Sequence, residues 1–86
     1  MFNIYTIYDK KTQSYDPPFA AATHGAAERI VDKIVNGEGN QVAEYAEDFS
    51  LWHVGKWNED TGETDAHKPV HLADLVAFKK KAVKNQ

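Results

Sequence analysis

Cysteine is absent from the sequence, and its absence excludes several kinds of chemistry at once. Disulfides, thiolate metal sites and cysteine catalysis all require that side chain. Long apolar runs are absent too, because no stretch approaches the roughly 20 residues that a membrane helix needs. The start, Met1–Tyr5, lacks the basic and apolar regions of a signal peptide, so we expect none. These absences fit a protein that folds in a reducing cytoplasm.

Motifs for nucleotide binding and nucleophilic catalysis are also missing. Gly37 and Gly39 are not followed by the Lys-Ser/Thr of a phosphate-binding loop, and no serine nucleophile motif occurs. Two acidic pairs, Glu47–Asp48 and Glu59–Asp60, lie in turn-like sequence, where solvated charges are common. A general acid–base pair would need a shaped cleft, which a thin core rarely provides. We therefore expect a protein that is not an enzyme.

The histidines give a weak metal signal. His67 and His71 have the four-residue spacing that places two ligands on one helix face. Pro69 lies between them and argues against a continuous helix there. Spacing marks no third ligand, so we expect no metal site and no cofactor.

Size and charge set the remaining bounds. With 86 residues the chain predicts one domain, residues 1–86, whose modest core would gain from homo-oligomerisation. Lys79, Lys80, Lys81 and Lys84 form a basic end without any acid. Since these four lysines contribute +4 to a net charge of −3, residues 1–78 carry −7. The acidic body would repel a phosphate backbone, whereas the basic end would attract one. The simpler explanation is that lysines favour the C-terminus of a helix.

Hydrophobic patterning predicts an α+β fold. β-branched and aromatic side chains dominate residues 2–8 and predict a strand, followed by a polar turn and the extended Tyr15–Phe19 segment. Thr23 is a candidate N-cap for an amphipathic helix that ends at Asn36–Gly37. The apolar stripe of this helix comprises Ala27, Ile30, Val31, Ile34 and Val35.

The second half predicts a hairpin and a terminal helix. Residues 49–57 form a strand with Gly55 as a bulge or close-approach point, and residues 63–65 a short return strand. A helix is expected from about His71, with Leu72, Leu75, Val76 and Val83 on one face. The expected architecture is a small antiparallel sheet of about three to four strands with two helices packed on it.

Aromatic residues make up 12% of the chain, which is enough for a stacking surface. Aromatic rings on an exposed sheet face can stack on unpaired bases, while lysines contact the phosphates. The stacking candidates are Tyr15, Phe19, Trp52 and Trp57, and the phosphate candidates are Lys79, Lys80, Lys81 and Lys84. The alternative is that these rings form the core and a subunit interface.

Four segments in a fixed order carry a family resemblance: Ile4–Lys11, Tyr15–Phe19, Asp48–Gly55 with Asp60–Gly62, and Lys68–Pro69. In this order and spacing they resemble the small nonstructural protein of gokushovirus-type microviruses, tailless phages with circular single-stranded DNA genomes. The resemblance implies a nonstructural protein made in the cytoplasm of an infected bacterium and absent from the mature virion. It also implies a role in viral DNA synthesis or packaging, and it transfers no catalytic residues.

Three functions remain open on these grounds. The first is a non-enzymatic accessory role in single-stranded DNA synthesis or packaging, in which the protein would bind single-stranded DNA, the replication protein or the procapsid. The second is a protein–protein module that docks on a viral or host replication or procapsid protein without contacting nucleic acid. The third is an inhibitor or modulator of a host protein, whose acidic surface would mimic nucleic acid. We expect no membrane partner.

Overall fold

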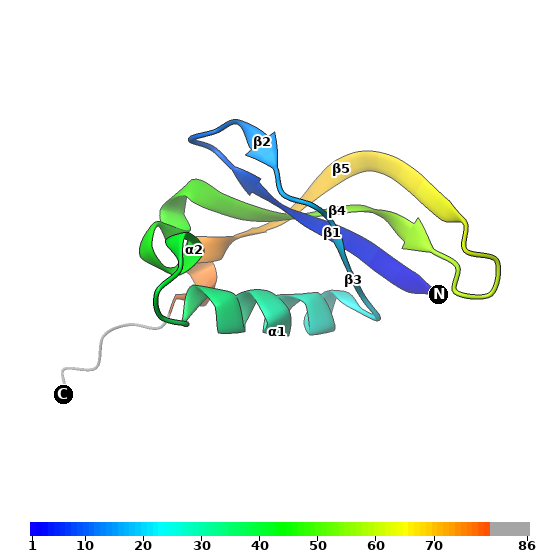
Figure 1. Ribbon diagram of the computed structural model, residues 1–86, viewed down its shortest axis with the longest axis horizontal. Helices are drawn as coiled ribbons and strands as arrows, with labels where there is room; N and C mark the ends of the chain where they lie inside the picture. Colours follow the sequence, from blue (N-terminus) through cyan, green and yellow to red (C-terminus); the bar gives the residue numbers. More distant parts are fainter. Residues whose placement is uncertain (80–86) are drawn as a thin grey trace.

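A computed structural model describes residues 1–79 of the chain (Figure 1). Three strands come first, three helical segments follow, and two long strands and a final helical turn complete the described residues; all strand pairs are antiparallel. The strands are β1 (Phe2–Asp9), β2 (Ser14–Tyr15), β3 (Phe19–Ala21), β4 (Phe49–Trp57) and β5 (Thr64–Asp74). The helices are α1 (His24–Val35), α2 (Gln41–Glu44) and the 3₁₀ turns η1 (Ala46–Asp48) and η2 (Leu75–Phe78).

One five-stranded sheet organises the molecule. The strand order is β2-β1-β4-β5, and β3 also pairs with β1. The predicted α+β class with an antiparallel sheet is confirmed, but the sheet has more strands than the three to four expected. The extra strands arise because the Tyr15–Phe19 segment leaves the edge of β1 after β2 and returns to it as β3.

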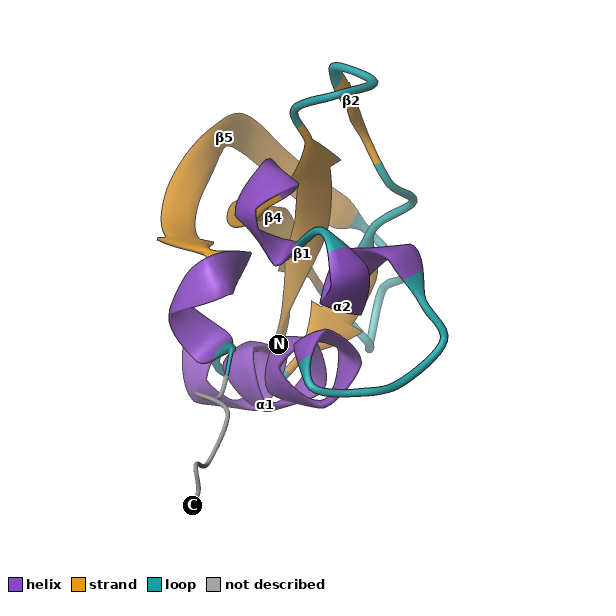
Figure 2. Ribbon diagram, turned by 90° about the vertical axis from the view of Figure 1, so that its left-hand side faces the viewer, coloured by secondary structure: helices purple, strands orange, loops and turns teal. Residues whose placement is uncertain are grey.

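Helix α1 begins and ends where the sequence predicts. The hydroxyl oxygen of Thr23 accepts a hydrogen bond from the Ala26 amide at 3.1 Å, which satisfies one of the free donors of the first turn. At the other end the Asn36 amide donates to the Asp32 carbonyl at 3.0 Å. Figure 2 shows α1 lying along one side of the sheet.

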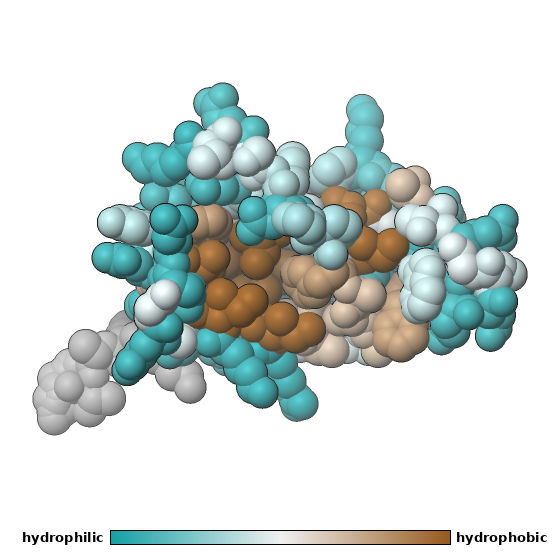
Figure 3. All heavy atoms as spheres, in the orientation of Figure 1, coloured by the Kyte–Doolittle hydropathy of each residue, from teal (hydrophilic) through white to brown (hydrophobic). Residues whose placement is uncertain are grey.

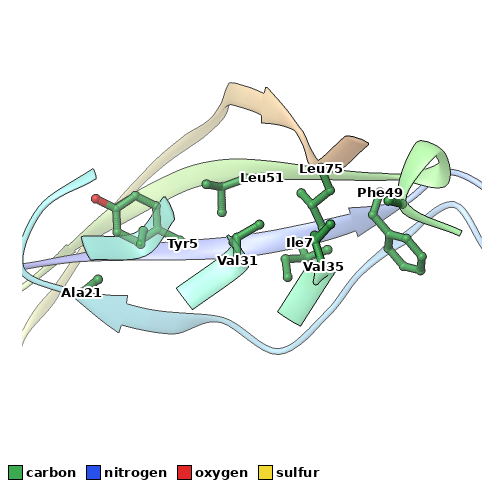
Figure 4. Packing of buried hydrophobic residues seen from close by; sticks show 10 residues of the cluster. Tyr5, Ile7, Ala21, Val31, Val35, Phe49, Leu51 and Leu75 are labelled. Carbon is green, nitrogen blue, oxygen red and sulfur yellow. The ribbon is translucent and has the colours of Figure 1, made fainter. Parts of the chain in front are cut away.

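The core lies between α1 and the inner sides of β1 and β4 (Figure 4). Tyr5 and Leu51 from the strands and Val31 from the helix are completely buried. Each buried aliphatic side chain of this kind contributes about 1.5–3 kcal/mol to folding. Only Ala27, Val31 and Val35 of the predicted helical stripe are fully buried; Ile30 is 39% exposed.

The predicted C-terminal helix is wrong over its described part. Residues 71–74 belong to β5, and only the single turn η2 follows. Pairing with β4 satisfies the backbone groups of that strand, and this outweighs a weak helical pattern. Leu75 is nevertheless completely buried, so the apolar residues of this segment reach the core by another route. Val83 lies outside the described residues.

Gly55 lies at a close approach between β4 and β5, as the sequence predicted. The strands shift register between His53 and Gly55. A Cβ atom at position 55 would lie 2.6 Å from the Asp65 carbonyl oxygen and 3.1 Å from the Ala66 Cα. Both obstacles are backbone atoms, so relief would require moving β5.

We therefore predict that Gly55→Ala destabilises the fold by about 1–3 kcal/mol, the usual cost of forcing an extra group into packed surroundings. Urea unfolding followed by tryptophan fluorescence would measure the loss. Gly25→Ala is the matched control, because its Cβ would meet nothing closer than Thr23 Oγ1 at 3.8 Å. Equal unfolding midpoints for the two variants would contradict the close approach.

Candidate functional site

The sheet has one face against α1 and a second face that we call the open face. Side chains of paired residues in antiparallel strands lie on the same face. Tyr5, Ile7 and Leu51 are in the core. Because successive residues of a strand face opposite sides, the alternate pairs Thr6–Trp52 and Tyr8–Ser50 belong to the open face. The open face is therefore where the aromatic residues of β1 and β4 that the core does not use come to lie.

Four rings gather on the open face around Trp52; we call them the Trp52 cluster. Its members are Tyr8, Tyr15, Trp52 and His71. They come from β1, β2, β4 and β5, and the register aligns them in two direct pairs, Tyr8 with Tyr15 and Trp52 with His71. The Trp52 ring centroid lies 6.4 Å from that of Tyr8, 6.0 Å from Tyr15 and 5.2 Å from His71.

Hydrogen bonds hold the Trp52 cluster in place. The indole Nε1–H of Trp52 donates to the Ser50 hydroxyl at 2.8 Å, and Ser50 is itself buried. His71 Nε2 lies 3.0 Å from a carboxylate oxygen of Asp74. The outer rings remain accessible, since Tyr15 is 46% exposed. A fixed aromatic surface with exposed ring area can stack on a planar ligand at a small entropic cost.

The other two stacking candidates lie elsewhere. Trp57 contacts Phe2 with the ring centroids 6.0 Å apart, at the opposite end of the β1–β4 pair. Phe19 stacks on the buried Tyr5 at 5.8 Å and packs against the core. The structure thus brings Tyr15 and Trp52 together, places Trp57 apart and gives Phe19 a core role.

The first lysine of the basic end is engaged in the fold. Lys79 Nζ donates to the Ala43 carbonyl at 2.6 Å and lies 3.4 Å from the carbonyl of Val35, the last residue of α1. A cation here complements the negative end of α1, whereas the simpler explanation had placed the lysines at the end of a helix of their own. Lys80, Lys81 and Lys84 lie outside the described residues.

The acidic pairs do not form a catalytic cleft with each other. Glu47 and Asp48 line an open hollow with Lys11 and Tyr45. Glu59 lies at the other end of the sheet, where its carboxylate Oε1 forms an ion pair with the N-terminal amine of Met1 at 3.0 Å. The pKa of Glu59 is lowered by backbone hydrogen bonding and by that amine. None of the helices in residues 1–79 is long and apolar enough to cross a membrane.

A histidine cluster on the helix side of the sheet was not anticipated by the sequence. The His53 ring lies 5.0 Å from that of His24 and 4.6 Å from that of His67, measured between centroids. Tyr5 joins the group through a 2.5 Å hydrogen bond to His24. His71, which has the four-residue spacing from His67, belongs to the open face instead. Spacing in the sequence could not show this grouping, because the three histidines come from three distant segments.

Burial, and then the neighbouring His67 and His24, lower the pKa of His53 below its ordinary 6.5. Lys56 acts in the same direction, and a hydrogen bond with the Gly55 backbone opposes it. The unfolded chain therefore takes up this proton at a higher pH than the folded chain. The titration of His53 therefore leaves the free energy of unfolding unchanged above about pH 6.5. Below that pH it reduces the free energy of unfolding, because the unfolded chain binds the proton more tightly.

We predict a lower urea midpoint at pH 5.5 than at pH 7.5, and a smaller difference between the two in His53→Asn. This window lies above the ordinary pKa of carboxylates, so histidines dominate the change. Glu47→Gln serves as a control that leaves the histidines in place. The same pH dependence in His53→Asn and in the original chain would contradict the assignment to His53.

The chain matches a known protein family over almost its whole length. The family described as Phage ORF5 protein matches residues 2–78, which include every strand and helix described above. No curated protein and no solved structure matches the chain. The family match is compatible with the narrower resemblance to gokushovirus-type microviruses. Since the match covers nearly the whole sequence, the chain belongs to the Phage ORF5 protein family.

Proposed function

We propose that this phage protein is a non-enzymatic accessory factor in viral single-stranded DNA synthesis or packaging, and that it binds single-stranded DNA through the Trp52 cluster. The observation that carries the proposal is the convergence of Tyr8, Tyr15 and Trp52 from three strands on the open face. Membership of a phage family supports a viral context. The infected bacterial cytoplasm is the corresponding location.

Stacking has to supply most of the affinity. Each base that stacks on an aromatic side chain contributes about 1–3 kcal/mol and does so with little sequence preference. Residues 1–79 carry −6, since Lys79 adds one positive charge to the −7 of residues 1–78. Lys10 and Lys11 follow Tyr8 in the turn after β1, but Asp9 and Asp16 directly follow Tyr8 and Tyr15. A third carboxylate, that of Asp74, contacts the His71 ring. The body therefore offers little net attraction for phosphate.

Titration of the Trp57→Phe variant with a thymidine oligonucleotide tests the proposal, because Trp52 is then the only source of tryptophan fluorescence. We predict saturable quenching. Tyr15→Ala in the same background should weaken binding about 5- to 150-fold, the equivalent of one lost stacking contact. Tyr45→Ala is the matched control, because Tyr45 is 49% exposed and has no part in the cluster. Equal affinities of the two variants would contradict the proposal.

The basic end gives a separate prediction. If Lys80, Lys81 and Lys84 contact phosphates, replacing all three by Gln should flatten the dependence of log affinity on log salt by up to about 2, or about 0.7 for each contact. Lys79 stays unchanged in this variant, because it bonds to Ala43 and its loss would disturb the fold. Lys33→Gln, in the exposed last turn of α1, is the control. An unaltered slope would show that these lysines do not bind the DNA backbone.

A protein–protein module is the second candidate, and the exposed aliphatic residues favour it. Ile30, Val70 and Val76 are 39–50% exposed. Figure 3 shows hydrophobic surface gathered between α1 and the sheet. Exposed apolar surface of this kind is found at protein interfaces. Absence of quenching by the oligonucleotide at low salt would favour docking on a replication or procapsid protein, for which sedimentation with purified procapsids is the direct measurement.

A further inference from the structure

His53 and His67 face each other across neighbouring strands; we call them the histidine pair. His53 Nδ1 and His67 Nε2 are 3.1 Å apart. Between the pairs His53–Val70 and Gly55–Ala66, β5 advances four residues while β4 advances two. The additional residues of β5 form an irregularity that includes His67. Bulges of this kind re-aim side chains and are common beside functional sites.

The tautomer of His53 follows from its hydrogen bonds. Asn3 Nδ2 donates to the Ala22 carbonyl at 3.1 Å, which fixes the orientation of the amide. Asn3 Oδ1 therefore faces His53 Nε2, at 3.1 Å. An amide oxygen can only accept, so Nε2 of His53 carries the hydrogen. In the neutral ring, Nδ1 then has a lone pair.

The tautomer of His67 follows in the same way. Its Nδ1 lies 2.6 Å from the Lys68 carbonyl oxygen, which can only accept a hydrogen bond. Nδ1 of His67 therefore carries the hydrogen, and Nε2 has a lone pair. Two lone pairs thus point toward each other across 3.1 Å. Two neutral rings in this arrangement repel each other unless a cation lies between the nitrogens.

We infer that His53 Nδ1 and His67 Nε2 form a two-histidine site for a divalent transition-metal ion of the kind that imidazole prefers, such as Zn²⁺, Cu²⁺ or Ni²⁺. Two nitrogens that are each ~2.0–2.1 Å from one ion, at angles between 90° and tetrahedral, are about 2.9–3.4 Å apart. The observed separation of 3.1 Å falls within that range.

The surroundings of the histidine pair agree with a metal site. Metal-binding histidines usually donate their other N–H to a carbonyl or carboxylate, and both rings donate to such an oxygen here. Within residues 1–79 no three His, Asp or Glu side chains converge as ligands, so water would complete the coordination. His67 is exposed and His53 is half-buried, which leaves a path from solvent. A bound ion would cross-link β5, an edge strand, to β4.

Zn²⁺ titration of the full chain at pH 7.5, followed by NMR of the histidine ring nitrogens, tests the site. At this pH a shared proton competes little, because histidine is ordinarily neutral. We expect saturable one-to-one shifts at His53 Nδ1 and His67 Nε2. His67→Ala should abolish saturation, and His67→Gln should do the same without leaving a gap at the surface. His71→Ala, which removes a histidine from the opposite face, should bind Zn²⁺ like the original chain.

Two results would overturn the inference. One is the absence of saturable shifts, with the two rings responding only to pH, which would identify a shared proton as the occupant. The other is unchanged Zn²⁺ affinity in both His67 variants. Neither result bears on DNA binding, because the histidine pair and the Trp52 cluster lie on opposite faces of the sheet and are tested with different probes.

Discussion

Pairing between β1 and β4 is the constraint on which the rest of the structure depends. Each residue from Phe2 to Asp9 has a partner on β4, and this pairing decides which side chains are buried beneath α1. Tyr5 and Leu51 enter the core because of it, and Trp52 is directed to the open face. A shift of the register by one residue would exchange the two sets. The core and the candidate DNA interface are therefore two consequences of one alignment.

Local patterns predicted the elements whose side chains interact mainly with near neighbours in the sequence. Helix α1 has a capping residue at Thr23, one apolar stripe and a stop at Asn36–Gly37, and all three signals agree. The end of the chain lacks such agreement. The spacing of Leu72, Leu75 and Val76 favours a helix, whereas the edge of β4 offers backbone partners to a strand. No local signal in the sequence reveals that this edge is available. Long-range pairing determined the outcome, and β5 extends over eleven residues.

The candidate site was only partly predictable for a related reason. Strict alternation would place Trp52 and Trp57 on opposite faces, because they are five positions apart in the sequence. A register shift adds one residue to β4 between the partners of Ile4 and Tyr5. Trp57 and Trp52 consequently pair with Phe2 and Thr6, which share a face of β1. Phe19 could not be assigned from its type, since an aromatic ring beside two prolines suits both a core and a surface. Tyr15 is placed beside Trp52 only by its pairing with Tyr8.

The distribution of charge also changes once the fold is known. As sequence, the four lysines near the end form one basic group of uniform character. In the structure Lys79 bonds to carbonyls at the ends of α1 and α2, so its charge offsets the helix dipole. A phosphate backbone that approaches the Trp52 cluster meets an acidic body, whose repulsion is screened beyond about 8 Å at physiological salt. Ring stacking acts at contact distance, where this screening does not weaken it. If the Trp52 cluster binds nucleic acid, the affinity therefore depends mainly on the geometry of the rings, because Lys10 and Lys11 beside Tyr8 are outweighed by the acidic residues of the body.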